Sequence, residues 1–120
     1  MRQLTRAEEE VMQLLWKKGK SRVAEIIEDM PEPKPAYNTT STIVRILEDK
    51  GFVGHEKVGR GFKYFALVEK DTYQKATMKK MVNSYFEGSF KNMVSFFVKE
   101  KNMSTKDLES ILKELDKTKD

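Results

Sequence analysis

The turn Gly59-Arg60-Gly61 constrains the fold of this 120-residue chain more than any other feature. The segments on either side, residues 52–58 and 62–68, contain β-branched and aromatic residues in partial alternation, as strands do. Glycines around so short a connection are typical of a β-hairpin. Three segments with helical character come before it, and three helices followed by a hairpin is the order of a winged helix–turn–helix. The sequence therefore predicts a mainly α fold with a small β-hairpin wing.

The three helices before the hairpin are predicted from their boundaries. Thr5 opens the first, over about 5–17, as the first residue of a capping box. Ser21 is the expected N-cap of the second helix, which ends where three prolines occur between residues 31 and 35. The third helix is expected over 36–51, where a glycine stops it.

The third helix begins with Asn-Thr-Thr-Ser-Thr at 38–42, residues that helices generally do not favour. With roughly 100° per residue, the side opposite the apolar residues carries Asn38, Ser41, Thr42, Arg45 and Asp49, whereas Ala36, Thr40, Ile43 and Leu47 lie together on the inward side. Amide, hydroxyl and guanidinium groups read base edges in the major groove, and the N-terminal part of a recognition helix contacts bases. A merely solvated face is the alternative, but such faces normally use Glu, Lys and Gln. This helix is therefore predicted to contact DNA.

The hairpin tip is a second candidate for DNA contact. Arg60 lies there with Lys63 nearby, and such cations can bind phosphates without reading sequence. An ordinary exposed turn with a solubilising arginine explains the tip equally well. The net charge is +4, and residues 34–70 hold seven Lys or Arg against four acids. This excess permits nucleic-acid binding without requiring it.

Residue types that would support catalysis are few. Cysteine is absent, which excludes disulfides and thiolate metal sites, and the single histidine, His55, has no clustered carboxylates to suggest a metal or a catalytic base. We interpret His55 as a structural residue. The sequence contains no phosphate-binding loop, dinucleotide fingerprint or nucleophile–base pair. We predict that the protein is not an enzyme and uses no metal or cofactor.

Residues 71–120 differ from the first 70 residues: they lack proline and carry apolar residues at helical spacing. We therefore expect a winged-helix DNA-binding domain over 1–70 and a helical dimerisation domain over 71–120. Three short amphipathic segments follow one another there, and they cannot bury their apolar sides alone. The simplest partner is a second copy of the chain. The predicted dimerisation residues are Tyr73, Met81, Tyr85, Phe90, Met93, Val94, Phe97, Leu108, Ile111, Leu112 and Leu115.

Targeting signals are also lacking in the sequence. No stretch approaches the roughly 18 apolar residues of a membrane span. The N-terminal segment lacks the apolar run of a signal peptide. We expect a cytoplasmic protein without membrane insertion.

Four stretches together resemble the penicillinase repressor family, which includes the repressors of β-lactamase and methicillin-resistance genes. They are LTRAEEEVMQLLWKKG at 4–19, AYNTTSTIVRILEDKGFV at 36–53, VGRGFKYFALV at 58–68 and YFEGSFKNMVSFFVKE at 85–100. The similarity covers nearly the whole chain, and the ordered set is more specific than any single motif. The resemblance implies a homodimeric repressor whose two winged-helix domains bind a palindromic operator in double-stranded DNA, with intertwined C-terminal helices holding the dimer.

The resemblance also implies site residues and a signalling route. By position, Asn38, Thr39, Ser41, Thr42 and Arg45 face DNA, and Arg60 and Lys63 lie on the wing. In well-known members a membrane β-lactam sensor triggers proteolysis at an Asn-Phe bond in the C-terminal region. The matching pair here is Phe96-Phe97, so the asparagine is missing.

Two functions are compatible with these features. The first is a homodimeric DNA-binding repressor of β-lactam-resistance-type genes, relieved by a sensor-triggered signal or by proteolysis, with a membrane sensor-protease as a further partner. The second is a winged-helix protein-interaction module without sequence-specific DNA binding, which the modest charge excess allows. The short polar face of the third helix favours the first.

Overall fold

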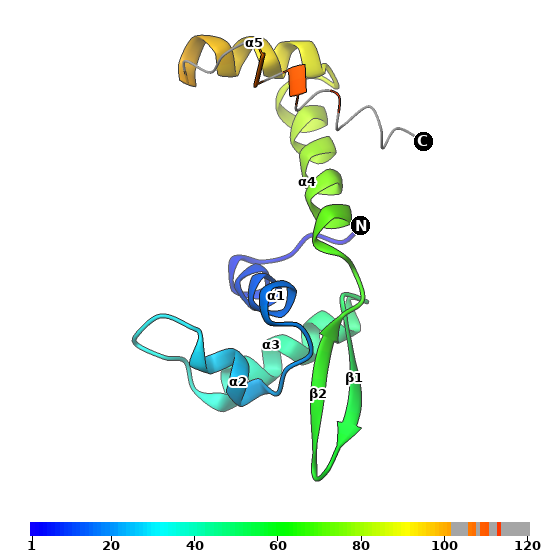
Figure 1. The fold of residues 1–120 in the computed structure, drawn as a ribbon. Helices are drawn as coiled ribbons and strands as arrows, with labels where there is room; N and C mark the ends of the chain where they lie inside the picture. The colour runs from blue at the N-terminus through cyan, green and yellow to red at the C-terminus, as the bar shows by residue number, and fades with distance from the viewer. Residues whose placement is uncertain (102–105, 108, 111–112, 114–120) are drawn as a thin grey trace. The chain divides into compact units, whose positions relative to one another are not determined.

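The chain folds into two compact units, Met1–Lys70 and Asp71–Asp120, of which the computed structural model describes residues 1–101, 106–107, 109–110 and 113. The first unit contains three helices followed by an antiparallel pair of strands (Figure 1): α1 Arg6–Lys18, α2 Val23–Glu28, α3 Tyr37–Asp49, β1 Val53–Val58 and β2 Gly61–Ala66. This order confirms the predicted mainly α fold with a hairpin wing.

The ends of α1 follow the local signals in the sequence. The Thr5 hydroxyl accepts the Glu8 N–H at 3.2 Å, and the Glu8 carboxylate accepts the Thr5 N–H at 2.9 Å. These two bonds form the predicted capping box, which satisfies donors that the first helical turn leaves unpaired. Gly19 ends the helix with φ of +81°, a conformation that costs glycine little.

The prediction that Ser21 caps α2 is wrong. The N-cap is Arg22, whose N–H donates to the Glu25 carboxylate at 2.9 Å. Ser21 instead forms a β-bridge with Tyr64, its N–H donating to the Tyr64 carbonyl at 2.9 Å and its carbonyl accepting the Tyr64 N–H at 2.8 Å. This extended pairing with the wing holds Ser21 outside the helix, and its hydroxyl bonds the Gly19 carbonyl.

The wing has a tighter turn than the sequence suggested. Val58 lies opposite Gly61, so Gly61 is the first residue of β2 and the connection is only Gly59-Arg60. Gly59 has φ of +63°, which a two-residue hairpin loop requires and glycine adopts freely. Farther along the pair, His55 lies opposite Tyr64, so these two side chains share one face of the hairpin.

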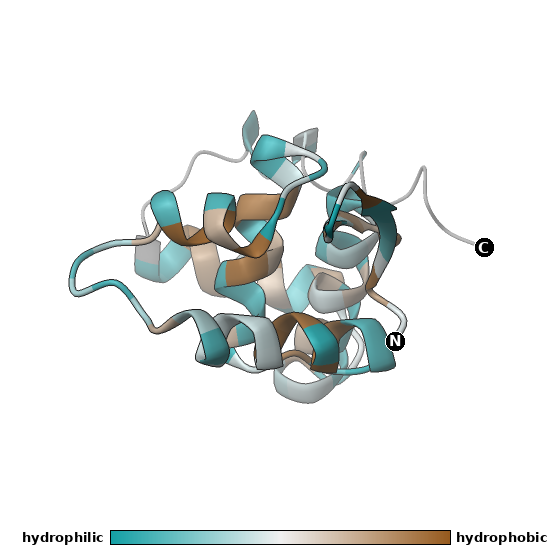
Figure 2. Ribbon diagram, turned by 90° about the horizontal axis from the view of Figure 1, so that it is seen from below, coloured by the Kyte–Doolittle hydropathy of each residue, from teal (hydrophilic) through white to brown (hydrophobic). Residues whose placement is uncertain are grey.

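The core of the first unit forms where α1, α2 and α3 meet the start of β1. Figure 2 shows hydrophobic stretches on the sides of helices that face one another, with polar residues outside. The apolar side chains that are at most 1% exposed in this region are Val11, Met12, Leu15, Ile26, Val44, Leu47, Phe52 and Val53. Their burial fixes α3 with its opposite side outward.

The inward side of α3 is close to the prediction. Thr40 and Leu47 are fully buried, together with Val44, and Ile43 is half-buried. Ala36 is exposed because it is the N-cap and precedes the helix. The Thr40 hydroxyl lies in this core without a hydrogen-bond partner.

The second unit contains α4 Lys70–Tyr85 and α5 Phe90–Lys101. Among the predicted dimerisation residues, Tyr73 and Met93 are buried, Tyr85 is 78% exposed, and the rest of those described are half-buried: Met81, Phe90, Val94 and Phe97. The other four lie outside the described residues: Leu108, Ile111, Leu112 and Leu115. Within the described part of the chain, no helix has the length and apolar character needed to cross a membrane.

Candidate nucleic-acid interface

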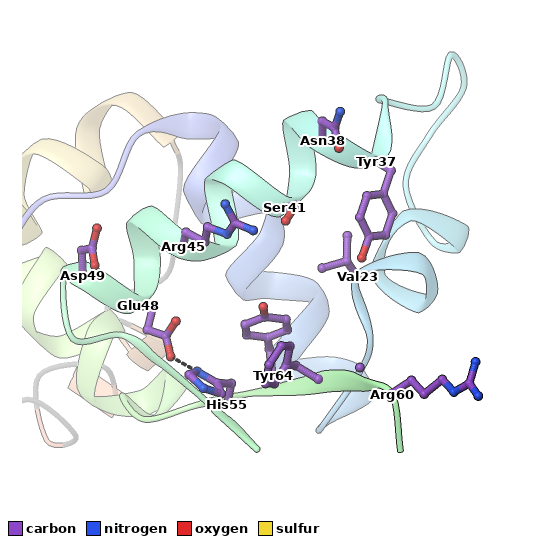
Figure 3. Close-up of a pocket in the computed structure, with 12 residues that line it drawn as sticks. Val23, Tyr37, Asn38, Ser41, Arg45, Glu48, Asp49, His55, Arg60 and Tyr64 are labelled. Atoms are coloured by element: carbon purple, nitrogen blue, oxygen red, sulfur yellow. Dashed lines mark hydrogen bonds and ion pairs between the residues drawn. The ribbon is translucent and has the colours of Figure 1, made fainter. Parts of the chain in front are cut away.

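The outer side of α3 and one face of the hairpin enclose an open hollow of about 680 Å³ (Figure 3). We call this hollow the α3–wing groove. It is lined by Val23, Tyr37, Asn38, Ser41, Arg45, Glu48, Asp49, His55, Arg60, Gly61, Phe62 and Tyr64. Most of these groups are polar or aromatic, and they come mainly from α3 and the hairpin with its turn, with Val23 added from α2.

Three of the predicted DNA-contacting residues of α3 lie along this groove. Asn38, Ser41 and Arg45 are spaced by three and four residues and line it together, as expected for one stripe of a helix. Thr39 and Thr42 are exposed but lie outside its lining. The Thr42 hydroxyl donates to the Asn38 carbonyl at 2.9 Å, so its hydrogen is used within the helix.

Arg45 has the most distinctive side chain in the groove. It is exposed, and the structure gives it no hydrogen bond or ion pair with any other described residue. Figure 3 shows its guanidinium directed toward Ser41, along the helix. An unpaired guanidinium presents five N–H donors in a planar fork, which suits bidentate contacts with a guanine edge or a phosphate.

Only one of the two predicted wing cations lines the groove, because successive side chains of a strand point to opposite faces. Arg60 lines the groove at its far end, where Figure 3 shows its side chain extending from the hairpin tip. Lys63 is absent from the lining, because it is on the opposite strand face from Phe62 and Tyr64.

The charge of Lys63 acts on Glu25 of α2. The Arg22 N–H, which donates to the Glu25 carboxylate, and with it the Lys63 charge, hold the pKa of Glu25 below its ordinary value.

Arg22, the N-cap of α2, contacts the hairpin through its guanidinium, a role that the sequence did not predict. Its Nη2 donates to the Val58 carbonyl at 3.0 Å, at the end of β1. A Cβ on Gly61 would lie 2.8 Å from Arg22 Nη1, so the missing side chain lets the guanidinium lie against the hairpin. These contacts connect the start of α2 to the hairpin on both sides of its turn.

The sequence did not single out the aromatic residues of the groove or Glu48 as parts of a site. His55, interpreted from the sequence as a structural residue, has partners in the groove: its Nδ1 pairs with the Glu48 carboxylate, and its ring lies edge-on to Phe62 with centroids 5.1 Å apart. Burial raises the pKa of Tyr64, the Glu48 charge adds to this, and Arg45 opposes it. Strand alternation places His55, Phe62 and Tyr64 on one face, but only the tertiary fold shows that this face is turned toward α3.

The chemistry of the groove is that of recognition. Among the described residues, no group of three or more His, Cys, Asp or Glu side chains is placed to hold a metal ion. The groove offers the Asn38 amide, the Ser41 hydroxyl and the guanidinium groups of Arg45 and Arg60. These donors, on one helix and one hairpin tip, can bond base edges and phosphates.

Comparisons with known proteins agree with this geometry. The family model described as "Penicillinase repressor" matches residues 4–117. The chain is 30% identical over 116 residues to the methicillin resistance regulatory protein MecI of Staphylococcus aureus strain N315, covering 96% of this chain and 94% of that protein. It is 25% identical over 118 residues to the penicillinase repressor of Bacillus licheniformis, covering 98% and 92%.

A solved structure shares the fold. It is the solution structure of the monomeric form of Bacillus licheniformis BlaI in complex with the blaP half-operator. The match has a TM-score of 0.50 and 30% sequence identity, and covers 60% of this chain and 89% of that one. The winged-helix assignment is thereby confirmed.

Proposed function

Because the chain belongs to the penicillinase repressor family, a family of transcriptional repressors and not of enzymes, we propose that it is a DNA-binding repressor whose α3–wing groove receives operator DNA. The observation that carries the proposal is the meeting of Asn38, Ser41 and Arg45 with the wing cation Arg60 in one open groove. Its relative of similar fold was solved in complex with a half-operator.

The residues in and beside the groove divide into two roles in this proposal. Asn38 and Ser41 lie in the N-terminal half of α3 and Arg45 lies just past its middle, on a helix whose other side is buried, so the major groove can receive them as base-reading groups. Thr39 and Thr42 flank this stripe and approach the sugar-phosphate backbone. Arg60 binds phosphate from the wing tip, and Lys63 contributes positive charge from the other strand face.

A mobility-shift assay with DNA from upstream of the protein's own gene tests the proposal. Specific binding should exceed binding to random duplex, and the logarithm of affinity should fall linearly with the logarithm of salt concentration because phosphate contacts release counterions. Equal affinity for both duplexes, or no binding at all, would support a protein-interaction module instead.

We further infer that the active repressor is a homodimer held by α4, α5 and the segment after them. The support is apolar surface that the described part of the second unit leaves exposed, including Tyr85 at 78%, Phe96 at 45% and Val98 at 38%. A two-fold dimer presents two α3–wing grooves, which suits a palindromic operator with half-sites about one helical turn apart.

We infer that a signal acting on the second unit relieves repression, with a membrane sensor-protease as the candidate source. The Phe96-Phe97 bond is the candidate cleavage site, and it lies inside α5. A protease needs the chain extended, so cleavage there requires α5 to unwind locally. Mass spectrometry of the protein from cells exposed to a β-lactam should find a fragment that ends at Phe96, and an intact chain under full induction would contradict this route.

A further inference from the structure

We propose that His55 is a positioning residue of the α3–wing groove: it holds the Glu48 carboxylate and so keeps the Arg45 guanidinium unpaired and available to DNA. The inference rests on the proposed function, because availability matters only if Arg45 binds operator. It assigns a role in recognition to two side chains that do not themselves have to contact a base.

The spacing of Arg45 and Glu48 makes their separation informative. They are three residues apart on α3, and oppositely charged side chains at this spacing are neighbours that attract each other. The structure nevertheless contains no ion pair between them. Glu48 Oε2 pairs with His55 Nδ1 instead, and Figure 3 shows Glu48 directed toward the hairpin while Arg45 is directed toward Ser41.

The wing holds the histidine in place for this contact. The His55 ring lies edge-on to Phe62 and is also 6.0 Å from the Tyr64 ring, which is its cross-strand partner. Because a carboxylate can only accept, Nδ1 must carry the hydrogen in this pair. His55 is therefore the donor of the pair: its side chain is 45% exposed but is placed by the two aromatic rings, and the Glu48 carboxylate accepts from it.

The consequence for binding follows from the competition for Arg45. If the His55 donor were lost, Glu48 could turn to Arg45, and that pair would have to break before the guanidinium could reach DNA. Asp49 provides the comparison within the same groove: it is an exposed carboxylate four residues from Arg45, and it forms no hydrogen bond or ion pair with His55. Only Glu48 should carry the dependence on His55.

Two substitutions separate the donor from the packing. His55→Leu removes the donor and keeps a side chain of similar size against Phe62, whereas His55→Asn keeps an N–H near the position of Nδ1. Operator affinity of the full-length chain should fall about two- to fivefold for His55→Leu, the range expected for one competing exposed ion pair. It should fall less for His55→Asn. Equal losses for both would mean that His55 only supports the wing.

Rescue identifies the carboxylate. Adding Glu48→Gln should abolish the effect of His55→Leu, whereas adding Asp49→Asn should leave that fold-change intact even if it alters affinity overall. In an Arg45→Ala background, His55→Leu should change affinity little. A full effect there would show that a freed Glu48 repels phosphate directly, which would overturn the role assigned to Arg45.

A measurement without DNA keeps the inference separate from the proposed function. The Nε–H resonance of Arg45 in the free protein should shift in His55→Leu and return in the variant that also carries Glu48→Gln. An unmoved resonance would overturn the inference even if operator binding is strong. If the wild-type chain fails to bind operator while the resonance behaves as expected, the proposed function fails and the His55–Glu48–Arg45 arrangement stands.

Discussion

Arg45 shows how one residue can be tested for reading a base as opposed to holding a phosphate. Arg45→Ala should weaken operator binding by about 1–3 kcal/mol if the guanidinium makes a bidentate guanine contact. The loss should be concentrated at one operator position, measured by mobility shift against single-base variants. Lys17→Ala, which removes an exposed cation of α1 outside the α3–wing groove, is the matched control and should change affinity little. A loss of the same size on random duplex would show that Arg45 binds phosphate.

Thr40 lies on the buried side of α3, so a change there should alter the stability of the fold and not DNA recognition. Its hydroxyl is fully buried and unpartnered, and such a group costs about 1–3 kcal/mol in desolvation. Thr40→Val has nearly the same shape, so it should raise the free energy of unfolding by about 1 kcal/mol in urea denaturation. Thr39→Val, at the exposed neighbouring position, should stay within about 0.5 kcal/mol of wild type. A destabilised Thr40→Val variant would show that the hydroxyl has a partner, such as a water molecule.

The sequence predicted the groove residues that a local pattern marks, namely the polar stripe of α3 and Arg60 at the hairpin tip. Helical spacing placed Asn38, Ser41 and Arg45 on one side of α3, and the structure brings these three together. His55 was interpreted as a structural residue, and its partners could not be named from the sequence because Glu48 and Tyr64 lie on other elements. Their meeting depends on how the hairpin packs against α3, and no local pattern encodes that.

At the scale of the elements, short sequence signals predicted the helix ends correctly where only neighbouring residues determine them. They failed where a hydrogen-bonded pairing with a distant segment determines the conformation. The capping box at Thr5 and the glycine at 19 mark α1 correctly, because both act within a few residues. Ser21 has the composition of an N-cap, yet the Tyr64 backbone takes it into a β-bridge. Hydrogen bonds between segments far apart in the chain override a cap preference of about 1 kcal/mol.

The contact that joins α3 to α1 predicts a pH dependence of stability. Glu8 is buried, and its carboxylate accepts from Lys50 Nζ at 2.6 Å and from the Thr5 N–H. Burial raises the pKa of Glu8, but the Lys50 and Thr5 hydrogen bonds and the Lys50 charge together leave it below its ordinary value. Because the folded-state pKa is depressed, the pair stabilises the protein above the unfolded-state pKa, and this contribution is lost as pH falls through the folded-state pKa.

Glu8→Gln tests that contact. It should lower the free energy of unfolding by about 1–3 kcal/mol at neutral pH, since it removes a hydrogen bond to a charged group and leaves Lys50 without its carboxylate. The difference from wild type should shrink as pH falls through the folded-state pKa of Glu8, which lies below its ordinary value, because the wild-type carboxyl then becomes protonated as well. Glu10→Gln, at an exposed position of the same helix, serves as control. A difference that stays constant down to pH 2 would contradict a charge-dependent contribution.

At the scale of the whole molecule, the two units divide the work in the proposed repressor. Met1–Lys70 holds every residue that lines the α3–wing groove, so recognition needs nothing from the second unit. Affinity depends on the second unit, because linking two copies raises the effective concentration of the second groove at the second half-site of a palindromic operator. The proposal therefore separates specificity, in the first unit, from avidity, in the second.

Deleting residues 71–120 tests that division. The remaining chain should sediment as a monomer and bind a half-site with the same base preference, but with affinity for the full operator lowered by about 10²-fold or more. In the full chain, Tyr85→Lys should shift the equilibrium toward monomer. Tyr85 is 78% exposed in a single copy, and we expect its ring to be buried in the dimer, where a lysine charge would be unfavourable. Ser84→Lys, the same change at the preceding exposed position, controls for charge alone. A truncated chain that still sediments as a dimer would locate the dimer contact in the first unit, and one that keeps full operator affinity as a monomer would remove the reason for a dimer.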